Sequence, residues 1–186
     1  MRVSVSGTSG SGKTTFATGL ARALGAPHID LDAINWQADW KDLNTHDKDE
    51  FRRRVTEAAT AEAWVSCGNY AAVRPIILGR ATHAVWLDDP QSVVMSRVFR
   101  RSLRRAWTGA ELWPGTGNME TFALWLSKEH PIRWAWDTYD QRRALIDGEM
   151  VDPALAHLQK HRLKHPREAE PLITQLAAES RLAPDA

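Results

Sequence analysis

Residues 2–14 read RVSVSGTSGSGKT, and this stretch decides the class of fold. Residues 2–6 alternate valine with other side chains and then meet glycines, which predicts a strand that runs directly into a glycine-rich loop. Residues 7–14 match G-x-x-x-x-G-K-[ST] at every fixed position, and residues 14–25 have the apolar spacing of a helix that stops at Gly25. A strand, a glycine-rich loop and a helix in this order predict a phosphate-binding loop (P-loop) for a nucleoside triphosphate.

Each position of that loop has a physical role in this interpretation. Glycines permit backbone angles and close approaches that a side chain would block, so successive N–H groups can point at phosphate oxygens. The N-terminus of the following helix adds a favourable field. We expect Lys13 to reach the β- and γ-phosphates of ATP, and Thr14 to ligate Mg²⁺. The residues expected to bind the nucleotide are Gly7, Thr8, Ser9, Gly10, Ser11, Gly12, Lys13, Thr14 and Thr15.

Length and composition restrict the alternatives. A chain of 186 residues with 43% hydrophobic residues suits a single domain, 1–186, with an adequate core. The formal net charge of +1 argues against a protein that coats nucleic acid. Cys67 is the only cysteine, which excludes an internal disulfide and favours a reducing, cytoplasmic location. No apolar run approaches the roughly 20 residues of a membrane helix, so we expect no membrane association.

Strand and helix patterns alternate along the chain. Continuous apolar runs at the strand positions are typical of a parallel sheet covered on both faces. The pattern predicts a three-layer α/β/α fold with a five-stranded parallel sheet. Thr45 is expected to cap a helix over 44–62, and Asp89 a helix that begins at Pro90. The predicted strands cover residues 2–6, 27–32, 63–68, 82–89 and 155–163.

The stretch SRVFRRSLRRAW, residues 96–107, places five arginines within nine residues. Their spacing predicts one cationic helical face, opposite an apolar face that includes Phe99 and Leu103. We expect the helix to begin an arginine-rich helical lid over 97–147 that neutralises phosphate charge and excludes water. A solvated cationic face is the alternative for any single arginine. Arg101 and Arg104 are expected to be catalytic, with Arg104 acting mostly in the transition state, and Arg97 and Arg105 are expected to bind nucleotide; the fifth arginine is Arg100.

Two acids follow the second predicted strand in the segment HIDLD. Asp30 and Asp32 are two residues apart, so on a strand they would share a face at the sheet edge where ligands bind. Asp32 is expected to hold Mg²⁺ through water or to act as a general base, and Asp30 to contact the acceptor. The alternative is that one of them caps a turn over 33–35. Asp88 is a weaker Mg²⁺ candidate.

The sequence resembles the adenylate-kinase-like P-loop proteins that are labelled "DNA topology modulation" proteins. The resemblance implies a nucleoside-kinase-like core, a lid and an acceptor region. It implies that Gly68, Asn69, Tyr70 and Arg74 bind the acceptor, with Arg80 as a weaker ligand, and that Arg162 or Arg167 stacks on adenine. The segments that carry it are GTSGSGKTT, PHIDLDAINW, WVSCGNY, VWLDDP, RVFRRSLRRAWTGAELWPG, LSKEHPIRWAWDTY and LKHPREAE.

The paired acids are also similar to those of small-metabolite kinases of the shikimate and gluconate type. Asn35, Trp36 and Trp40 follow the acids and are candidates to line an acceptor pocket, with tryptophans packed in the core as the alternative. The function predicted from the sequence is an ATP-dependent phosphotransferase that acts on a nucleotide or small metabolite. The alternative is a nucleotide-switched nucleic-acid-binding ATPase that uses the arginine helix. The histidines at 157, 161 and 165 are interleaved with basic residues, so we do not expect a metal site there. The acceptor and the oligomeric state stay open.

Overall fold

The computed structural model of the protein describes residues 1–120 and 131–182. Its centre is a five-stranded sheet in the order β2-β3-β1-β4-β5, in which every neighbouring pair is parallel. The predicted parallel sheet is therefore confirmed. The strands are β1 (Arg2–Gly7), β2 (His28–Asp30), β3 (Trp64–Cys67), β4 (His83–Leu87) and β5 (Gln159–Leu163).

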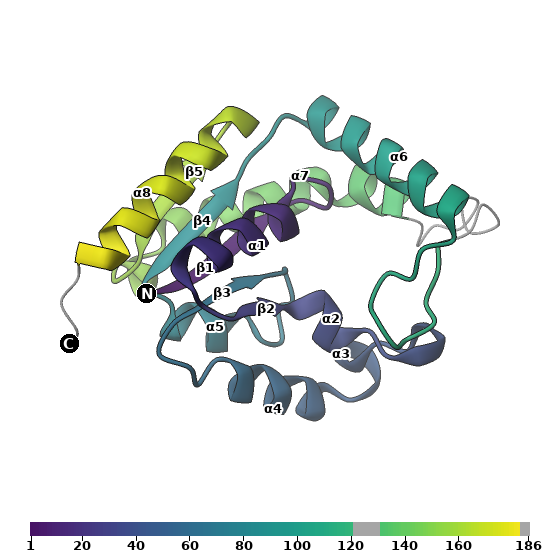
Figure 1. Ribbon diagram of the computed structural model, residues 1–186, viewed down its shortest axis with the longest axis horizontal. Helices are drawn as coiled ribbons and strands as arrows, with labels where there is room; N and C mark the ends of the chain where they lie inside the picture. Colours follow the sequence, from purple (N-terminus) through teal and green to yellow (C-terminus); the bar gives the residue numbers. More distant parts are fainter. Residues whose placement is uncertain (121–130, 183–186) are drawn as a thin grey trace.

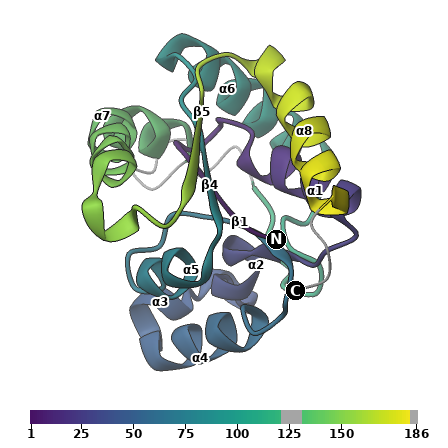
Figure 2. The same ribbon diagram turned by 90° about the vertical axis from the view of Figure 1, so that its left-hand side faces the viewer.

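Helices cover both faces of the sheet, which confirms the three-layer α/β/α fold. Figures 1 and 2 show α1 and α8 on one face, α4, α5 and α7 on the other, and α6 beyond the carboxyl ends of the strands. The α-helices are α1 (Lys13–Leu24), α2 (Leu31–Asn35), α3 (Leu43–His46), α4 (Lys48–Ala58), α5 (Arg74–Arg80), α6 (Gln91–Thr108), α7 (Pro131–Val151) and α8 (Ala169–Leu182). Single turns of 3₁₀ helix are η1 (Ala38–Trp40), η3 (Pro153–Leu155) and η4 (Pro166–Glu168).

Each face of the sheet packs against its helices through an apolar cluster of its own. Leu20 of α1 and Leu176 of α8 are fully buried against the sheet on one side. Phe51 of α4, Trp64 of β3 and Val73 before α5 are fully buried on the other. No helix in the described part of the chain is long and apolar enough to cross a membrane.

The helix predicted over 44–62 is wrong in its boundaries. The structure has two helices there, because Asp42 caps α3 by accepting from the Thr45 N–H at 2.8 Å, and Asp47 caps α4 by accepting from the Glu50 N–H at 3.1 Å. Thr45 is therefore inside a short helix and is not a cap. Asp42 begins α3, and Asp47 both ends α3 and begins α4.

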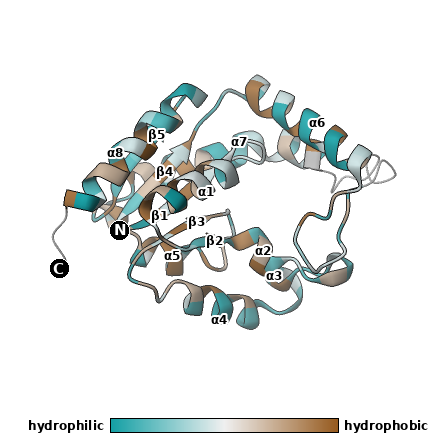
Figure 3. Ribbon diagram, in the orientation of Figure 1, coloured by the Kyte–Doolittle hydropathy of each residue, from teal (hydrophilic) through white to brown (hydrophobic). Residues whose placement is uncertain are grey.

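The faces of α6 also differ from the prediction. Val94, Val98 and Ser102 form its buried stripe, whereas Phe99 and Leu103 are 49% and 43% exposed. The five arginines consequently differ in burial: Arg97, Arg101 and Arg105 are half-buried beside that stripe, and Arg100 and Arg104 are exposed. Apolar and polar residues alternate along the helix in Figure 3.

Helices α6 and α7 pack together through Val94, Val98, Ala135 and Tyr139. The Tyr139 hydroxyl donates to the backbone oxygen of Asp89 at 2.9 Å, which ties α7 to the end of β4. Further along α7, Ile146 is 2% exposed, so that part of the helix belongs to the body of the domain. Of the predicted lid, residues 121–130 lie outside the described residues, and its movement as a lid stays a prediction.

Candidate active site

The P-loop follows the carboxyl end of β1 and has the backbone that phosphate binding needs. Gly10 and Gly12 have φ values of 88° and 90°, which favour glycine. Gly12 is the N-cap of α1, with no side-chain cap and no acidic residue in the first turn. The first N–H groups of α1 therefore remain available to an anion.

Helix α6 lies directly against this loop. A Cβ atom on Gly10 would stand 2.2 Å from Val98 Cγ2. Arg97 Nη1 donates to the Ser11 backbone oxygen at 3.2 Å and to Asp89 Oδ2 at 2.6 Å. Asp89 is therefore the ion-pair partner of Arg97, and the expectation that it caps α6 is wrong, since Pro90 is the N-cap.

Lys13 lies where charges from four elements converge. Its Nζ donates to the Thr8 backbone oxygen at 2.8 Å. Burial lowers the pKa of Lys13, Asp32 acts in the opposite direction, and Arg101 and Arg142 lower the pKa further. The charges that act on Lys13 thus include side chains of α2, α6 and α7.

The two acids of HIDLD do not share a strand face, which corrects that expectation. Asp30 ends β2 and caps α2, where its Oδ1 accepts from the Asp32 N–H at 3.0 Å and from the Ala33 N–H at 3.5 Å. Burial, and then the Asp32 charge, raise the pKa of Asp30. Asp32 lies in the first turn of α2, and its Oδ1 accepts from the Tyr70 hydroxyl at 2.5 Å. The capping alternative is thus realised by Asp30, and Asp32 faces the site.

The segment after β3 connects the P-loop to α7. Gly68 has a φ of 136°, and a Cβ there would stand 2.7 Å from Leu31 Cβ. Asn69 Nδ2 donates to the Gly7 backbone oxygen at 2.6 Å, and Arg142 Nη1 donates to the Asn69 backbone oxygen at 2.9 Å. Burial, and then the charge of Arg74, lower the pKa of Arg142.

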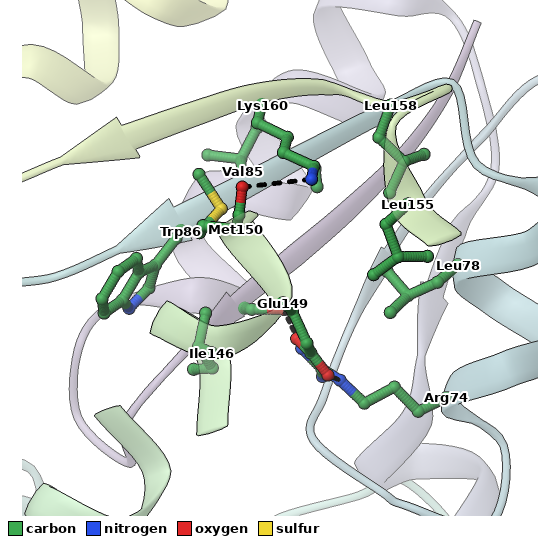
Figure 4. Close-up of a pocket in the computed structure, with 12 residues that line it drawn as sticks. Arg74, Leu78, Val85, Trp86, Ile146, Glu149, Met150, Leu155, Leu158 and Lys160 are labelled. Atoms are coloured by element: carbon green, nitrogen blue, oxygen red, sulfur yellow. Dashed lines mark hydrogen bonds and ion pairs between the residues drawn. The ribbon is translucent and has the colours of Figure 1, made fainter. Parts of the chain in front are cut away.

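Arg74, the expected acceptor ligand, has a protein partner. Its guanidinium forms a two-point ion pair with Glu149 of α7, drawn in Figure 4, and Nη2 also donates to Ser6 Oγ at 3.3 Å. The adjoining cavity has a volume of about 10 Å³, which is room for a single water. The ion pair with Glu149 disfavours the expected role of Arg74 as a ligand of the acceptor. Arg80, the weaker candidate for that role, donates to the Thr60 backbone oxygen.

The arginines of α6 have different surroundings. Burial, and then Arg105, lower the pKa of Arg101, and its buried Nε has no hydrogen-bond partner among residues 1–120 and 131–182. Arg105 lies 3.8 Å from the carboxylate of Glu120. Arg104, expected to be catalytic, is exposed on the outer side of the helix. The geometry thus favours Arg101 over Arg104.

Asp88 belongs to a charge network with two arginines. Its carboxylate accepts hydrogen bonds from Arg143 at 2.7 Å and from Arg162 at 2.7 Å. Burial alone would raise the pKa of Asp88, but the hydrogen bonds from both arginines outweigh it and hold the pKa below its ordinary value. The guanidinium of Arg162 lies 4.1 Å from the ring centre of Trp86, so it is not free to stack on adenine as the resemblance implied. No three potential metal ligands cluster in the part of the chain that the structure describes.

Three tryptophans join the loop after α6 to the loop after α2. Trp36 and Trp113 stack at 5.8 Å, and Trp40 meets both rings edge-on. Asn118 is 2% exposed; its Nδ2 donates to the Gln37 backbone oxygen at 2.8 Å, and its Oδ1 accepts from the Trp40 N–H at 3.0 Å. We call Trp36, Trp40, Trp113 and Asn118 the tryptophan clasp. The sequence suggested Trp36 and Trp40 as pocket walls but gave no sign of their pairing with Trp113.

Several site residues were missed by sequence reasoning. Arg142 falls within the predicted lid over 97–147 but was given no role of its own, and its hydrogen bond to residue 69 spans 73 positions of the chain. Glu149 and the pairing of Asp88 with Arg143 were not foreseen. Opposite charges far apart in sequence carry no local pattern, and the excess of arginine over nearby acid was the only available signal.

Comparisons with known proteins agree with this architecture. Residues 9–112, more than half of the chain, match the family model described as shikimate kinase. The chain is similar to the solved structure of shikimate kinase from Acinetobacter baumannii in complex with shikimate, with a TM-score of 0.57 and 19% identity over 98% of this chain and 95% of that one. For a gluconokinase from Sinorhizobium meliloti 1021 the TM-score is 0.53, with 18% identity over 99% and 97%.

A third similar structure is deoxyadenosine kinase from M. mycoides with products bound, with a TM-score of 0.53 and 11% identity over 98% of this chain and 100% of that one. At these identities the solved structures establish the fold alone. The comparison with curated proteins gives no match. The family model and these three structures support the resemblance to P-loop kinases, but not the narrower DNA topology label.

Proposed function

The chain belongs to the shikimate kinase family and is an ATP-dependent kinase, and we propose that it transfers the γ-phosphoryl group of Mg-ATP to a hydroxyl group of a small anionic acceptor. The observation that carries the proposal is the P-loop geometry, with positive-φ glycines before the uncapped start of α1 and Lys13 Nζ bonded to the Thr8 carbonyl. Beside it, hydrogen bonds tie Asp32 to Tyr70 and Arg142 to Asn69. The cations Lys13 and Arg142 fit the phosphates of the nucleotide and an anionic group of the acceptor.

The P-loop supplies the nucleotide side. Its positive-φ glycines and the uncapped start of α1 fit a triphosphate, and the buried Ser11 Oγ has no partner among the described residues. Lys13 would exchange its present bond to the Thr8 carbonyl for phosphate oxygens. Thr14, exposed at the start of α1, would ligate Mg²⁺ and Asp32 would hold it through water; the ion would neutralise charge on the phosphates.

The acceptor side is the space bordered by Asp32, Asn69 and Arg142. Arg142 is a half-buried cation whose bond in the structure goes to a neutral backbone oxygen, so a carboxylate or phosphate of the acceptor is a fitting partner. The carboxylate of Asp32 would accept the hydrogen bond of the attacking hydroxyl and take up its proton as a general base. An anionic hydroxy compound satisfies both groups.

Arg101 is proposed as the cation that stabilises charge on the transferring group. It lies on the inner side of α6, with an unpartnered buried Nε and with Asp32 near enough to influence its pKa. Charge that develops in the transition state is best stabilised by a preorganised, partly dehydrated cation. Arg104 is exposed and lacks that setting.

The test measures ADP release by the purified protein with Mg-ATP against a panel of hydroxy acids that includes shikimate and gluconate, neutral sugars, nucleosides and nucleoside monophosphates. We expect strong stimulation by one anionic member and none by its uncharged analogue. Arg142→Ala should raise KM for that acceptor at least about 10-fold with little change in KM for ATP, since one charge-assisted hydrogen bond contributes roughly 1.5–3 kcal/mol. Stimulation by neutral sugars alone would refute the anionic acceptor.

The nucleic-acid alternative makes a different prediction. A duplex bound by the exposed Arg100 and Arg104 would give an affinity that falls with salt at a log–log slope of about −0.9 per phosphate contacted. We expect no DNA stimulation of ADP release, since family and fold are those of small-molecule kinases. DNA-dependent turnover that vanishes in Arg100→Ala/Arg104→Ala would favour the alternative. A cytoplasmic location, supported by the single free cysteine Cys67, stays part of the proposal.

A further inference from the structure

Tyr70 makes a hydrogen bond that the proposed chemistry has not yet used. Its hydroxyl donates to Asp32 Oδ1 at 2.5 Å, across 38 positions of the chain. The backbone of Tyr70 is also fixed, because its carbonyl accepts from the N–H groups of Val73 and Arg74 at 3.2 and 3.0 Å, where α5 begins. The donor therefore comes from a rigid turn.

The ring of Tyr70 has a fixed direction as well. Phe51, fully buried in the core, meets it edge-on with ring centres 5.2 Å apart. Tyr70 is thus held in place as a donor to Asp32.

The hydrogen bond fixes how Asp32 can be used. The Tyr70 hydroxyl takes Oδ1 of Asp32, and Lys13 Nζ donates to the Thr8 carbonyl. A carboxylate held at one oxygen keeps a fixed orientation and can accept a second hydrogen bond at the other oxygen.

We propose that Tyr70 is a positioning residue for Asp32: it occupies Oδ1 and leaves Oδ2 for the acceptor hydroxyl. This role rests on the proposed kinase function. It predicts that loss of the phenol hydroxyl affects transfer more than binding of ATP, because Asp32 is then no longer held in the orientation in which Oδ2 takes up the proton.

Tyr70→Phe keeps the ring and removes only the donor. We expect kcat to fall by about 10–100-fold, part of what a positioned base contributes, with KM for ATP changed less than about 3-fold and the urea midpoint nearly unchanged. Tyr139→Phe is the matched control, since Tyr139 is the only other tyrosine and its hydroxyl bonds to a backbone oxygen. It should leave kcat unchanged. In an Asp32→Asn background, Tyr70→Phe should have no further effect on kcat.

A second readout does not need turnover. In ¹⁵N-labelled protein, the Tyr70 hydroxyl should give a downfield proton signal that is not attached to nitrogen. It should disappear in Tyr70→Phe and Asp32→Asn and remain in Tyr139→Phe.

Three results would overturn the proposal. A missing signal in the wild type removes the hydrogen bond on which the role depends. If the wild type shows the signal but Tyr70→Phe keeps the full kcat, the hydrogen bond has a structural role only. A present signal in a wild type that phosphorylates no acceptor refutes the proposed function, and the positioning role falls with it, so the two failures are distinguishable.

Discussion

Substitution of Gly10 by alanine tests whether α6 is part of the P-loop structure. Gly10 has a φ of 88°, and its Cβ would meet Val98 Cγ2 at 2.2 Å and the Val94 backbone oxygen at 3.0 Å. A left-handed conformation costs an alanine about 1–2 kcal/mol, and overpacking a tight contact costs about 1–3 kcal/mol. We therefore expect Gly10→Ala to lower the free energy of unfolding by about 2–5 kcal/mol.

A double-mutant cycle separates these two contributions. Val98 is fully buried, so Val98→Ala alone should lower the free energy of unfolding by about 1–3 kcal/mol. In Gly10→Ala/Val98→Ala the methyl group that the new Cβ strikes is gone, and only the backbone strain and the carbonyl contact remain. The double variant should be more stable than the sum of the single effects by about 1–3 kcal/mol.

Urea unfolding followed by tryptophan fluorescence measures all three variants. Gly79→Ala is the matched control, because Gly79 lies in α5 at an ordinary φ and a Cβ there meets nothing within 4 Å. It should be neutral or slightly stabilising, since alanine favours helices over glycine by about 1 kcal/mol. Effects of Gly10→Ala and Val98→Ala that add within about 0.5 kcal/mol would refute the packing of α6 on the P-loop.

Three further predictions concern other parts of the fold. Asn118→Ala removes both hydrogen bonds of the tryptophan clasp and should lower the free energy of unfolding, measured in urea, by about 1–3 kcal/mol. Met119→Ala, at the exposed neighbouring residue, should change the free energy of unfolding little. Equal effects of the two substitutions would contradict a structural role of the clasp. Burial lowers the pKa of His83 and of His161, so protonation favours the unfolded chain and stability should be lost as the pH falls below the ordinary value of 6.5. In urea unfolding, His161→Gln should reduce the fall in the free energy of unfolding between pH 7 and pH 5. An unchanged pH dependence would exclude His83 and His161 as its source. Burial raises the pKa of Cys67 to about 12, so a maleimide should label the thiol only after unfolding, and rapid labelling of the native protein would contradict the buried site.

The parts of the fold that the sequence predicted are those encoded by neighbours along the chain. The P-loop and α1 were predicted because strand, glycines and helix follow each other within residues 2–25. Strands β3 and β4 were found because a buried parallel strand is a largely continuous apolar run. Strand β2 was predicted too long, since Asp30 ends it by capping α2. An acid after a short apolar run is compatible with a strand end and with a cap, and only the tertiary position of α2 decides between them.

The faces of α6 show a different limit. Two stripes on this helix have i, i+4 spacing: Val94, Val98 and Ser102, and Phe99 with Leu103. Periodicity favours the larger side chains for the buried stripe. The structure buries the smaller ones because the P-loop passes so close that Gly10 touches Val98, and a large side chain would not fit. The choice depends on a contact between residues 88 positions apart, which no local pattern contains.

Burial now divides the five arginines of α6 by role. A cation that loses water must gain a partner or have its pKa lowered. Arg97 gains Asp89, and it ties α6 to the P-loop. Arg101 keeps a buried Nε without a protein partner among the described residues, and its pKa is lowered. A phosphate that arrives with the nucleotide would supply the missing charge, so Arg101 is the arginine of this helix whose stabilisation most depends on the ligand, whereas the exposed Arg100 and Arg104 are already hydrated.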